Sequence, residues 1–212
     1  YDKKGFLNVR IDRKRKFLAS TFLRALGLNS DTDILGSFYR STTIQIHDKK
    51  LWWQVDDNLI GRRLAYDVVK GKKVIVPAGR KLTRNSISKF KKAGVTEVEV
   101  AIEDLAAAVS LSEAVDETSG EILVESNQDI NGSVINAIME AGITSLDLIF
   151  PSLDEVGPML SDTVRKDPIK STDEALIEIY RKQRPGDPPT LDTATALFEG
   201  MFFDPRKYDF SR

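Results

Sequence analysis

The sequence predicts an α+β protein, and three features of its 212 residues indicate this class. Apolar residues at helical spacing predict helices near both ends of the chain. Alternation of apolar and polar residues predicts strands from Thr43 onward. One pattern of strand, helix and strand then occurs twice at a constant offset of 48 residues. We therefore expect residues 1–38 and 157–212 to form a discontinuous, mainly helical base domain that carries an inserted α+β domain over residues 39–156.

The first segment is expected to hold a strand, a basic turn and two helices. The strand covers residues 6–11 and leads into the turn Asp12-Arg13-Lys14-Arg15-Lys16. An amphipathic helix follows over residues 17–26 and is ended by the glycine after it. A second, short helix starts at Ser30 or Asp31.

A β-hairpin is expected at the start of the inserted domain. Residues 43–47 alternate as a strand, Asp48-Lys49-Lys50 forms the turn, and residues 51–55 pair back. Because successive side chains of a strand point to opposite faces, Trp52 and Trp53 must face opposite ways. One of the two is expected in the core, and the other is a candidate exposed contact.

The internal repeat places residues 74–102 in correspondence with residues 122–150. Each copy reads as a strand, a loop, a short helix and an alternating strand, and Gly94 and Gly142 stand where glycine ends a helix. The matched positions are Val74-Ile75-Val76 with Ile122-Leu123-Val124, Leu82 with Ile130, Ile87 with Ile135, Phe90 with Ile138, Val98 with Leu146, Val100 with Leu148, and Ile102 with Phe150. We interpret the two copies as a duplicated module; coincidence is the weaker alternative.

Two helices are expected near the C-terminal end, on either side of a stiff loop. Ser171 and Glu174 have the spacing of a capping box, and Thr190 is a candidate cap of the second helix. The apolar positions are Leu176, Ile179 and Tyr180, with Gln183 in the same register, and then Ala194, Leu197, Phe198 and Met201. The loop between them contains Pro185, Gly186, Asp187, Pro188 and Pro189. Prolines fix φ and glycine supplies one flexible position, so the loop should protrude as a rigid segment. An ordinary proline-rich connection is the alternative.

Charge is strongly segregated although the net charge is only −1. Residues 62–92 contain eleven Lys and Arg and a single acid, whereas residues 101–156 contain twelve Asp and Glu and no Lys or Arg. Such an asymmetry steers partners by the sign of their charge. The sequence has no apolar run long enough for a membrane span, and the absence of cysteine excludes disulfides and cysteine zinc sites. We interpret the chain as a fragment of a longer polypeptide, since it starts with Tyr1 and both ends lie in patterned, charged sequence.

Residues for catalysis or metal binding are not expected. His47 is the single histidine, so a multi-histidine metal site is excluded. The pairs Asp56-Asp57 and Glu103-Asp104 are adjacent in sequence, which makes their side chains diverge on a regular element. No glycine-rich phosphate loop occurs, and no pattern pairs a nucleophile with a base. We therefore assign no catalytic residue, metal site or cofactor to this chain.

Three stretches, in the same order, resemble the β subunit of bacterial DNA-directed RNA polymerase. They are Val9-Arg10-Ile11-Asp12-Arg13-Lys14-Arg15-Lys16 with Phe22-Leu23-Arg24-Ala25-Leu26-Gly27, then Leu160-Ser161-Asp162-Thr163-Val164-Arg165-Lys166-Asp167, then residues 179–189 with Leu197-Phe198-Glu199-Gly200-Met201-Phe202-Phe203 and Arg206-Lys207-Tyr208-Asp209. They are similar to the second lobe of that subunit, and residues 39–156 resemble the insertion carried there in many lineages. The pair Lys182-Gln183 departs from the family pattern, in which apolar residues such as methionine are frequent.

The resemblance implies a non-catalytic part of a magnesium-dependent polymerase in the bacterial cytoplasm, associated with the nucleoid. It implies the other subunits (β′, α, ω and the sigma factor) and DNA in the main channel as partners, and transcription regulators at the insertion. It also implies that the region of Asp12 and Arg13 lies near downstream DNA and that residues 181–189 correspond to the gate loop.

Basic residues of the two end segments are the candidate nucleic-acid contacts. Asp12, Arg13 and Arg15 belong to the predicted turn, and Arg181 and Arg184 flank the start of the predicted loop. Arginine can neutralise phosphates without reading sequence, which makes binding salt-dependent. The alternative is a freestanding nucleic-acid-binding or regulatory domain that uses the basic stretch 62–92.

Overall fold

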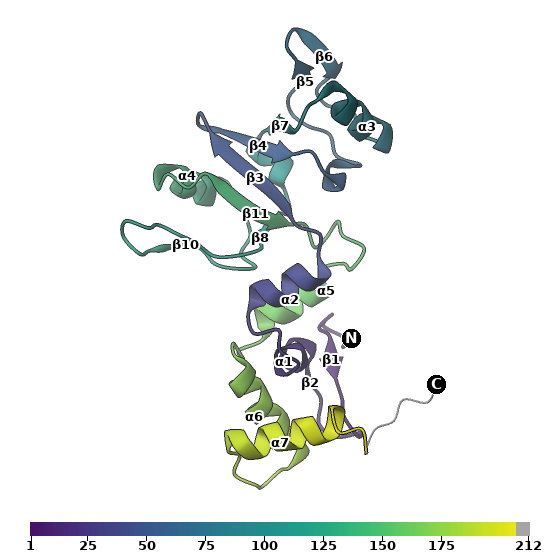
Figure 1. Ribbon diagram of the computed structural model, residues 1–212, viewed down its shortest axis with the longest axis vertical. Coiled ribbons are helices and arrows are strands. Elements are labelled where there is room, and N and C mark those ends of the chain that lie inside the picture. Colours follow the sequence, from purple (N-terminus) through teal and green to yellow (C-terminus); the bar gives the residue numbers. More distant parts are fainter. Residues whose placement is uncertain (207–212) are drawn as a thin grey trace. The chain divides into compact units, whose positions relative to one another are not determined.

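The computed structural model describes residues 1–206, which divide into two compact units (Figure 1). Unit 1 combines residues 1–37 with the chain from Val156 onward, and unit 2 comprises Phe38–Glu155. Helices and small sheets occur together, in agreement with the predicted α+β class. Lys207, Tyr208 and Asp209 of the last matched stretch, and the rest of the predicted base segment, lie outside the described residues.

Unit 1 is mainly helical, with one short β-ribbon. Its elements are β1 (Asn8–Val9), β2 (Phe17–Leu18), α1 (Ala19–Ala25), α2 (Asp31–Phe38, ending at the boundary of the units), α5 (Met159–Lys166), α6 (Thr172–Gln183) and α7 (Leu191–Phe202). The prediction of a helix from residue 17 was wrong at its start. Phe17 and Leu18 pair with Val9 and Asn8 as an antiparallel strand, so backbone pairing overrides local helix periodicity there.

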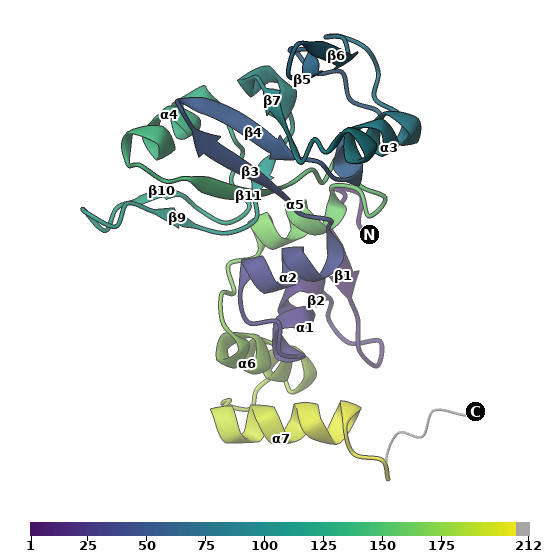
Figure 2. The same cartoon turned by 45° about the horizontal axis from the view of Figure 1, so that its top comes forward.

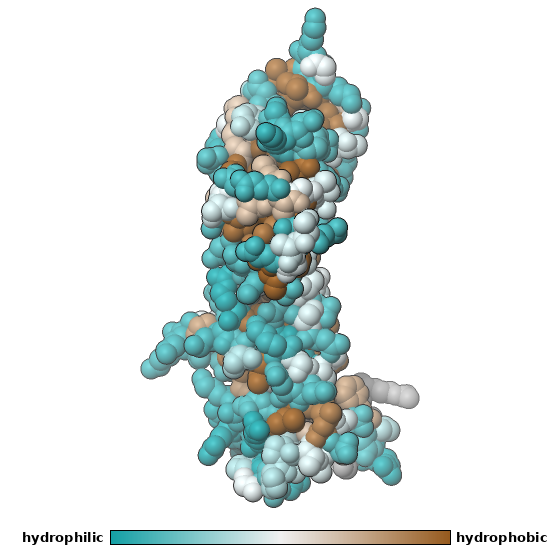
Figure 3. All heavy atoms as spheres, turned by 90° about the vertical axis from the view of Figure 1, so that its left-hand side faces the viewer, coloured by the Kyte–Doolittle hydropathy of each residue, from teal (hydrophilic) through white to brown (hydrophobic). Residues whose placement is uncertain are grey.

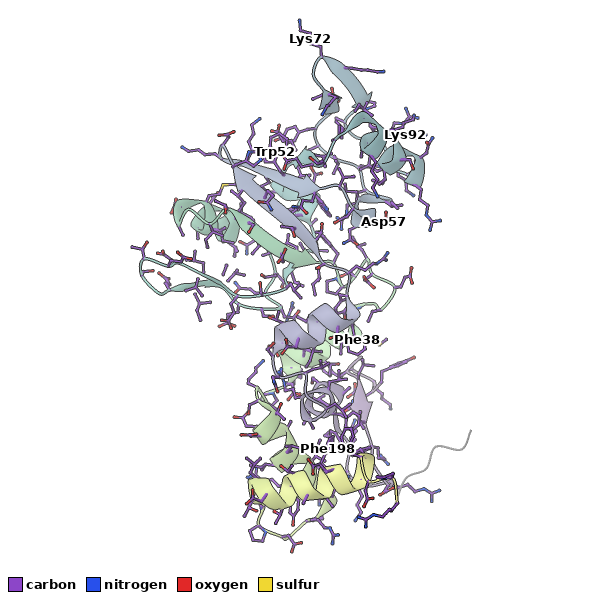
Figure 4. The ribbon with its side chains drawn as sticks, in the orientation of Figure 1. Phe38, Trp52, Asp57, Lys72, Lys92 and Phe198 are labelled. Atoms are coloured by element: carbon purple, nitrogen blue, oxygen red, sulfur yellow. The ribbon has the colours of Figure 1, made fainter. Side chains whose placement is uncertain are left out.

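The core of unit 1 lies between α1, α6, α7 and the ribbon. Its fully buried side chains come from both segments of the unit: Ile11, Phe17, Leu176, Ile179, Ala194 and Phe198. Phe198 (Figure 4) lies with its ring centroid 6.0 Å from that of Phe22 and 4.9 Å from that of Phe202. Leu197 and Met201 of the predicted stripe are only half-buried, and the half-buried Phe202 also packs against this core.

Buried polar groups connect the two segments of unit 1. The carboxylate of Asp167 accepts hydrogen bonds from the hydroxyls of Ser20 (2.5 Å) and Thr21 (2.8 Å). The fully buried Arg24 forms an ion pair with Asp31 and donates to the carbonyl of Asn29. Because burying such groups is favourable only when they are hydrogen-bonded, these contacts specify how the segments meet.

Unit 2 is built on a five-stranded sheet in the order β7-β4-β3-β11-β8. The strands are β3 (Thr42–His47), β4 (Lys50–Gln54), β7 (Glu97–Val100), β8 (Val109–Ser110) and β11 (Ser145–Ile149), all paired antiparallel. The predicted hairpin is confirmed as β3–β4. Trp53 is fully buried, whereas Trp52 faces the opposite side and stacks on His47 with ring centroids 5.0 Å apart.

Two helices and two small hairpins complete unit 2 (Figure 2). They are β5 (Val68–Lys70), β6 (Lys73–Val76) and α3 (Arg84–Ala93), then β9 (Ala114–Val115), β10 (Ile122–Val124) and α4 (Gly132–Glu140). Short 3-10 helices at Asp57–Leu59 and Ile102–Leu105 precede the hairpins. Gly94 caps α3 with φ 69°, and Gly142, just after α4, has φ 73°.

One half-buried arginine connects the two halves of unit 2. The guanidinium carbon of Arg62 lies 4.6 Å from the ring centroid of Trp53 and 3.8 Å from that of Phe150. Its Nε donates to the carbonyl of Asn58, and its Nη1 donates to that of Asp104. Burial lowers the pKa of Arg62 to about 10, so this side chain stays charged at neutral pH and serves the fold.

Within residues 1–206 no helix is both long and apolar enough to cross a membrane. On the face drawn in Figure 3, hydrophobic residues form small areas interrupted by hydrophilic ones. Single exposed apolar residues of this kind are normal on protein surfaces.

Candidate nucleic-acid interface

The predicted basic turn connects β1 to β2. Ile11 before it and Phe17 after it are buried in the core of unit 1, while every residue of 12–16 is exposed. The amide of Lys14 donates to the carbonyl of Ile11 over 2.9 Å, which closes a four-residue turn. Asp12 and Arg13 at its centre have φ 48° and φ 59°. Positive φ at both central positions is the geometry of a type I′ turn.

This turn is strained by its own sequence. Type I′ turns favour Asn-Gly, because a Cβ atom conflicts with the left-handed backbone. Arg13 has no short side chain that could satisfy the backbone locally, and left-handed geometry costs such a residue about 1–2 kcal/mol. Strain of this kind persists where the surrounding structure enforces it and is enriched at functional sites. The observation therefore singles out Asp12 and Arg13 among the basic-turn residues.

The predicted stiff loop joins α6 to α7, and both of its predicted caps are present. Ser171 accepts from the amide of Glu174 at the start of α6, and Thr190 forms a reciprocal capping box with Thr193 at the start of α7. Arg184 ends α6 by donating its amide to the carbonyl of Tyr180 over 2.8 Å. Pro185, Gly186, Asp187 and Pro188 are exposed, Pro189 is half-buried, and Gly186 has φ 97°.

A lysine connects the turn to the loop. Nζ of Lys14 donates to the carbonyl oxygen of Gln183, the last residue of α6, over 3.4 Å. A cation at this position also complements the negative end of the helix dipole. The turn and the start of the loop are thereby joined, although they lie far apart in sequence. Sequence patterns did not predict this role for Lys14, because no local spacing links it to Gln183.

The candidate arginines carry unneutralised charge. Arg13, Arg15, Arg181 and Arg184 are exposed, and within residues 1–206 their guanidinium groups form no ion pair or hydrogen bond. Lys16 and Lys182, by contrast, lie 3.6 Å and 3.2 Å from the carboxylates of Asp2 and Glu178. In the described chain Arg184 also forms no ion pair with the nearby Asp187.

Gln183, one of the two residues that depart from the family pattern, is buried at the end of α6. Its side chain is 6% exposed, and its Nε2 has no hydrogen-bond partner within residues 1–206. An unpaired buried amide costs about 1–3 kcal/mol. The position is therefore suited to an apolar side chain.

The carboxylate pairs singled out by the sequence have structural roles. Asp56 caps the first 3-10 helix by accepting from the amide of Asn58 over 2.8 Å, and burial raises its pKa. Asp104 accepts from the amides of Ala101 and Ala65. Across residues 1–206 no group of three or more His, Asp or Glu side chains is arranged to hold a metal ion.

Comparison with known proteins gives a consistent family. The chain is 51% identical over 213 residues to the DNA-directed RNA polymerase subunit beta of Solibacter usitatus, and 48% identical over 219 residues to that of Koribacter versatilis. The corresponding protein of Syntrophotalea carbinolica is 37% identical over 213 residues. Each match covers 100% of this chain. The chain is a segment of an RNA polymerase β subunit.

This segment of the β subunit spans only a small part of the curated relatives, 15% of the first two and 16% of the third. No family model matches the chain. The family membership is shown by the three relatives, each of which aligns with the whole of this chain. The stretches that carry the resemblance in the sequence lie in unit 1, where they supply the buried Arg24 and Asp167 and the exposed Arg13 and Arg184.

Proposed function

We propose that this segment acts in transcription as a non-catalytic part of the polymerase, the second lobe of the β subunit, and that it lines the main DNA channel. The observation that supports this most directly is the Lys14–Gln183 hydrogen bond, which joins the two matched basic segments on one core. Arg13 and Arg184 are then available to contact phosphates.

The loop over residues 181–189 is proposed to act as the gate loop at the channel. Two features support this: Pro185 and Pro188 stiffen an exposed segment, and Arg181 and Arg184 present charge at its base. A rigid loop loses less conformational entropy when it meets a partner. The partners proposed for the assembled enzyme are β′, α, ω, the sigma factor and DNA, in the bacterial cytoplasm at the nucleoid. Nucleotide transfer and its magnesium are assigned to the parent complex.

Unit 2 is proposed to be the lineage-specific insertion, a docking surface built by duplication. The first copy contains β6, α3 and β7, and the second contains β10, α4 and β11. The helices start at residues 84 and 132, and the final strands start at residues 97 and 145, which reproduces the offset of 48 residues. Val98 and Leu146 are both buried at equivalent positions.

The experiment that tests the channel role replaces Arg13 and Arg184 by alanine, singly and together, in the complete polymerase. Each lost phosphate contact should lower the log–log salt slope of open-complex stability by about 0.9. Lys3→Ala is the control, because Lys3 is exposed and forms no ion pair within residues 1–206. An unchanged slope in the double variant would contradict the channel role. The second candidate function is a freestanding nucleic-acid-binding domain. It predicts that this chain alone binds nucleic acid as tightly as the complete subunit does.

A further inference from the structure

The basic stretch 62–92 folds into one part of unit 2, made of the β5–β6 hairpin, α3 and the connection between them. Asp67 is the single acid in this stretch, and its carboxylate accepts from the amide of Ala78 over 2.7 Å. The one acid of the stretch is therefore bound to the backbone of the same stretch and, within residues 1–206, pairs with none of its cations.

Helix α3 separates apolar from basic residues around its axis. Ile87 and Phe90 are buried in the core of unit 2. The opposite, exposed face carries the cations of the helix, which are Arg84, Lys89, Lys91 and Lys92. Arg84 and Lys91 are seven positions apart and Lys89 and Lys92 are three apart, so the cations form two neighbouring rows on the exposed side of the helix.

The hairpin is held against this helix. Val68 and Val76 anchor it in the core, and Nζ of Lys70 donates to the carbonyl of Gly94 at the end of α3 over 2.9 Å. Lys72 follows Gly71 (φ 59°) at the tip of the hairpin, and Figure 4 shows Lys72 and Lys92 on the hairpin and on α3. The hairpin and the helix therefore present their cations from a connected framework.

Most of these cations are unpaired. Arg62 is half-buried and donates to the carbonyl of Asn58, and Arg63 donates to the carbonyl of Gly79 over 2.7 Å. Within residues 1–206 the side chains of the others form no ion pair or hydrogen bond, and all are exposed: Lys72, Lys73, Arg80, Lys81, Arg84, Lys89, Lys91 and Lys92. Eight unpaired cations on neighbouring elements repel each other unless an anionic partner lies across them.

The second half of unit 2 carries the opposite charge. The equivalent elements β9, β10 and α4, with the turns around them, carry exposed Glu113, Glu117 and Glu121 and no Lys or Arg. One framework thus presents opposite charge on its two halves. The basic half attracts a polyanion and the acidic half repels it, so the two charges together favour one position of the polyanion on unit 2.

We propose that the surface formed by α3 and the β5–β6 hairpin is a second nucleic-acid contact, which holds the phosphate backbone of duplex DNA and is separate from the arginines of unit 1. A polyphosphate backbone matches it because it carries many negative charges close together, and the hairpin and α3 carry many exposed cations without a partner in the described chain. Contacts of this type carry affinity without base specificity. Exposed Tyr66, Val69 and Val74 add apolar area beside the cations.

The test uses the whole 212-residue chain and a fluorescent duplex, with anisotropy measured over a range of salt concentrations. The variant Lys72→Gln/Lys89→Gln/Lys92→Gln removes three exposed, unpaired cations and should leave the fold intact. It should reduce the log–log salt slope by about 2.7. Between 50 and 200 mM salt the unmodified chain should then lose about 40-fold more affinity than the variant. An unchanged slope overturns the proposal.

Two further variants distinguish this surface from the unit 1 arginines and from a general effect of net charge. Arg13→Ala/Arg184→Ala removes the unit 1 contacts and must leave the reduction of about 2.7 caused by the lysine variant in place. Adding Glu113→Gln/Glu117→Gln/Glu121→Gln to the lysine variant restores its net charge to that of the unmodified chain. If DNA binding then recovers fully, the loss of binding was caused by net charge and not by this surface, and the proposal is overturned. Salt-sensitive self-association of the chain in sedimentation, lost in the lysine variant without any change in DNA binding, would assign the surface to the acidic half of a second copy and overturn the proposal.

Discussion

Replacing Asp12-Arg13 by Asn-Gly should make unit 1 more stable while it weakens DNA binding by the polymerase. Both residues have positive φ, and relief of the Cβ conflict contributes about 1–2 kcal/mol at the arginine. The added freedom of glycine in the unfolded chain costs about 0.5–1 kcal/mol. Because asparagine also tolerates left-handed backbone better than most residues, the net gain should be about 1 kcal/mol. For a chain of this size such a gain raises Tm by about 2–4 °C.

The chain contains a matched control for this change. Asp48 and Lys49 form the turn of the β3–β4 hairpin with φ 53° and φ 57°, so Asn-Gly should relieve the same strain there. Urea unfolding followed by circular dichroism measures both gains in the 212-residue chain, and open-complex salt dependence in the full polymerase measures binding. We expect both variants to be more stable and only Asp12→Asn/Arg13→Gly to bind less. If that variant loses stability while the control gains, the first turn is not strained and the inference from strain to function fails.

Four further results are expected. Asp167→Ala should lower the free energy of unfolding in urea by about 3 kcal/mol, because it leaves two buried hydroxyls unpaired. Asp167→Asn should lower it less, since it keeps an acceptor. Equal losses in the two variants would refute this. Gln183→Met should raise the free energy of unfolding by about 1 kcal/mol by removing an unpaired buried amide, and any loss counts against it. Burial raises the pKa of Asp56 above its usual 3.8, so the folded state binds this proton more tightly than the unfolded state does. The free energy of unfolding should therefore fall as the pH rises from the unfolded-state pKa to the folded-state pKa of this carboxyl. Asp56→Asn should make the free energy of unfolding less dependent on pH in this range. Replacing residues 39–156 by a short linker should leave a base that unfolds cooperatively, and a molten product would disprove it.

Local signals in the sequence were sufficient for most element ends. Ser171 and Thr190 cap helices as their spacing predicts, because capping involves only residues three positions apart. The β3–β4 hairpin was predictable for the same reason, since its register depends on a short turn. Ile87 and Ile135, which were expected in helices, lie in α3 and α4.

Non-local contacts account for what was missed. Phe17 and Leu18 follow a helical pattern and became a strand because Asn8 and Val9 offer backbone partners. The site depended on the same kind of contact. Sequence patterns identified the exposed arginines by composition, whereas the bond that joins their two segments, from Lys14 to the end of α6, connects residues with a separation of 169. Nor does composition reveal the left-handed backbone at Asp12 and Arg13.

These contacts also explain how unit 1 forms from two segments that lie far apart in the sequence. The core around Phe198 takes Ile11 from the first segment and Leu176 and Ile179 from the second, so each segment buries its apolar side chains against the other. Asp167 and Thr163 reinforce the union by bonding to Ser20 and to the amide of Leu7. All buried side chains of this core belong to unit 1, so the two segments supply it without side chains from unit 2.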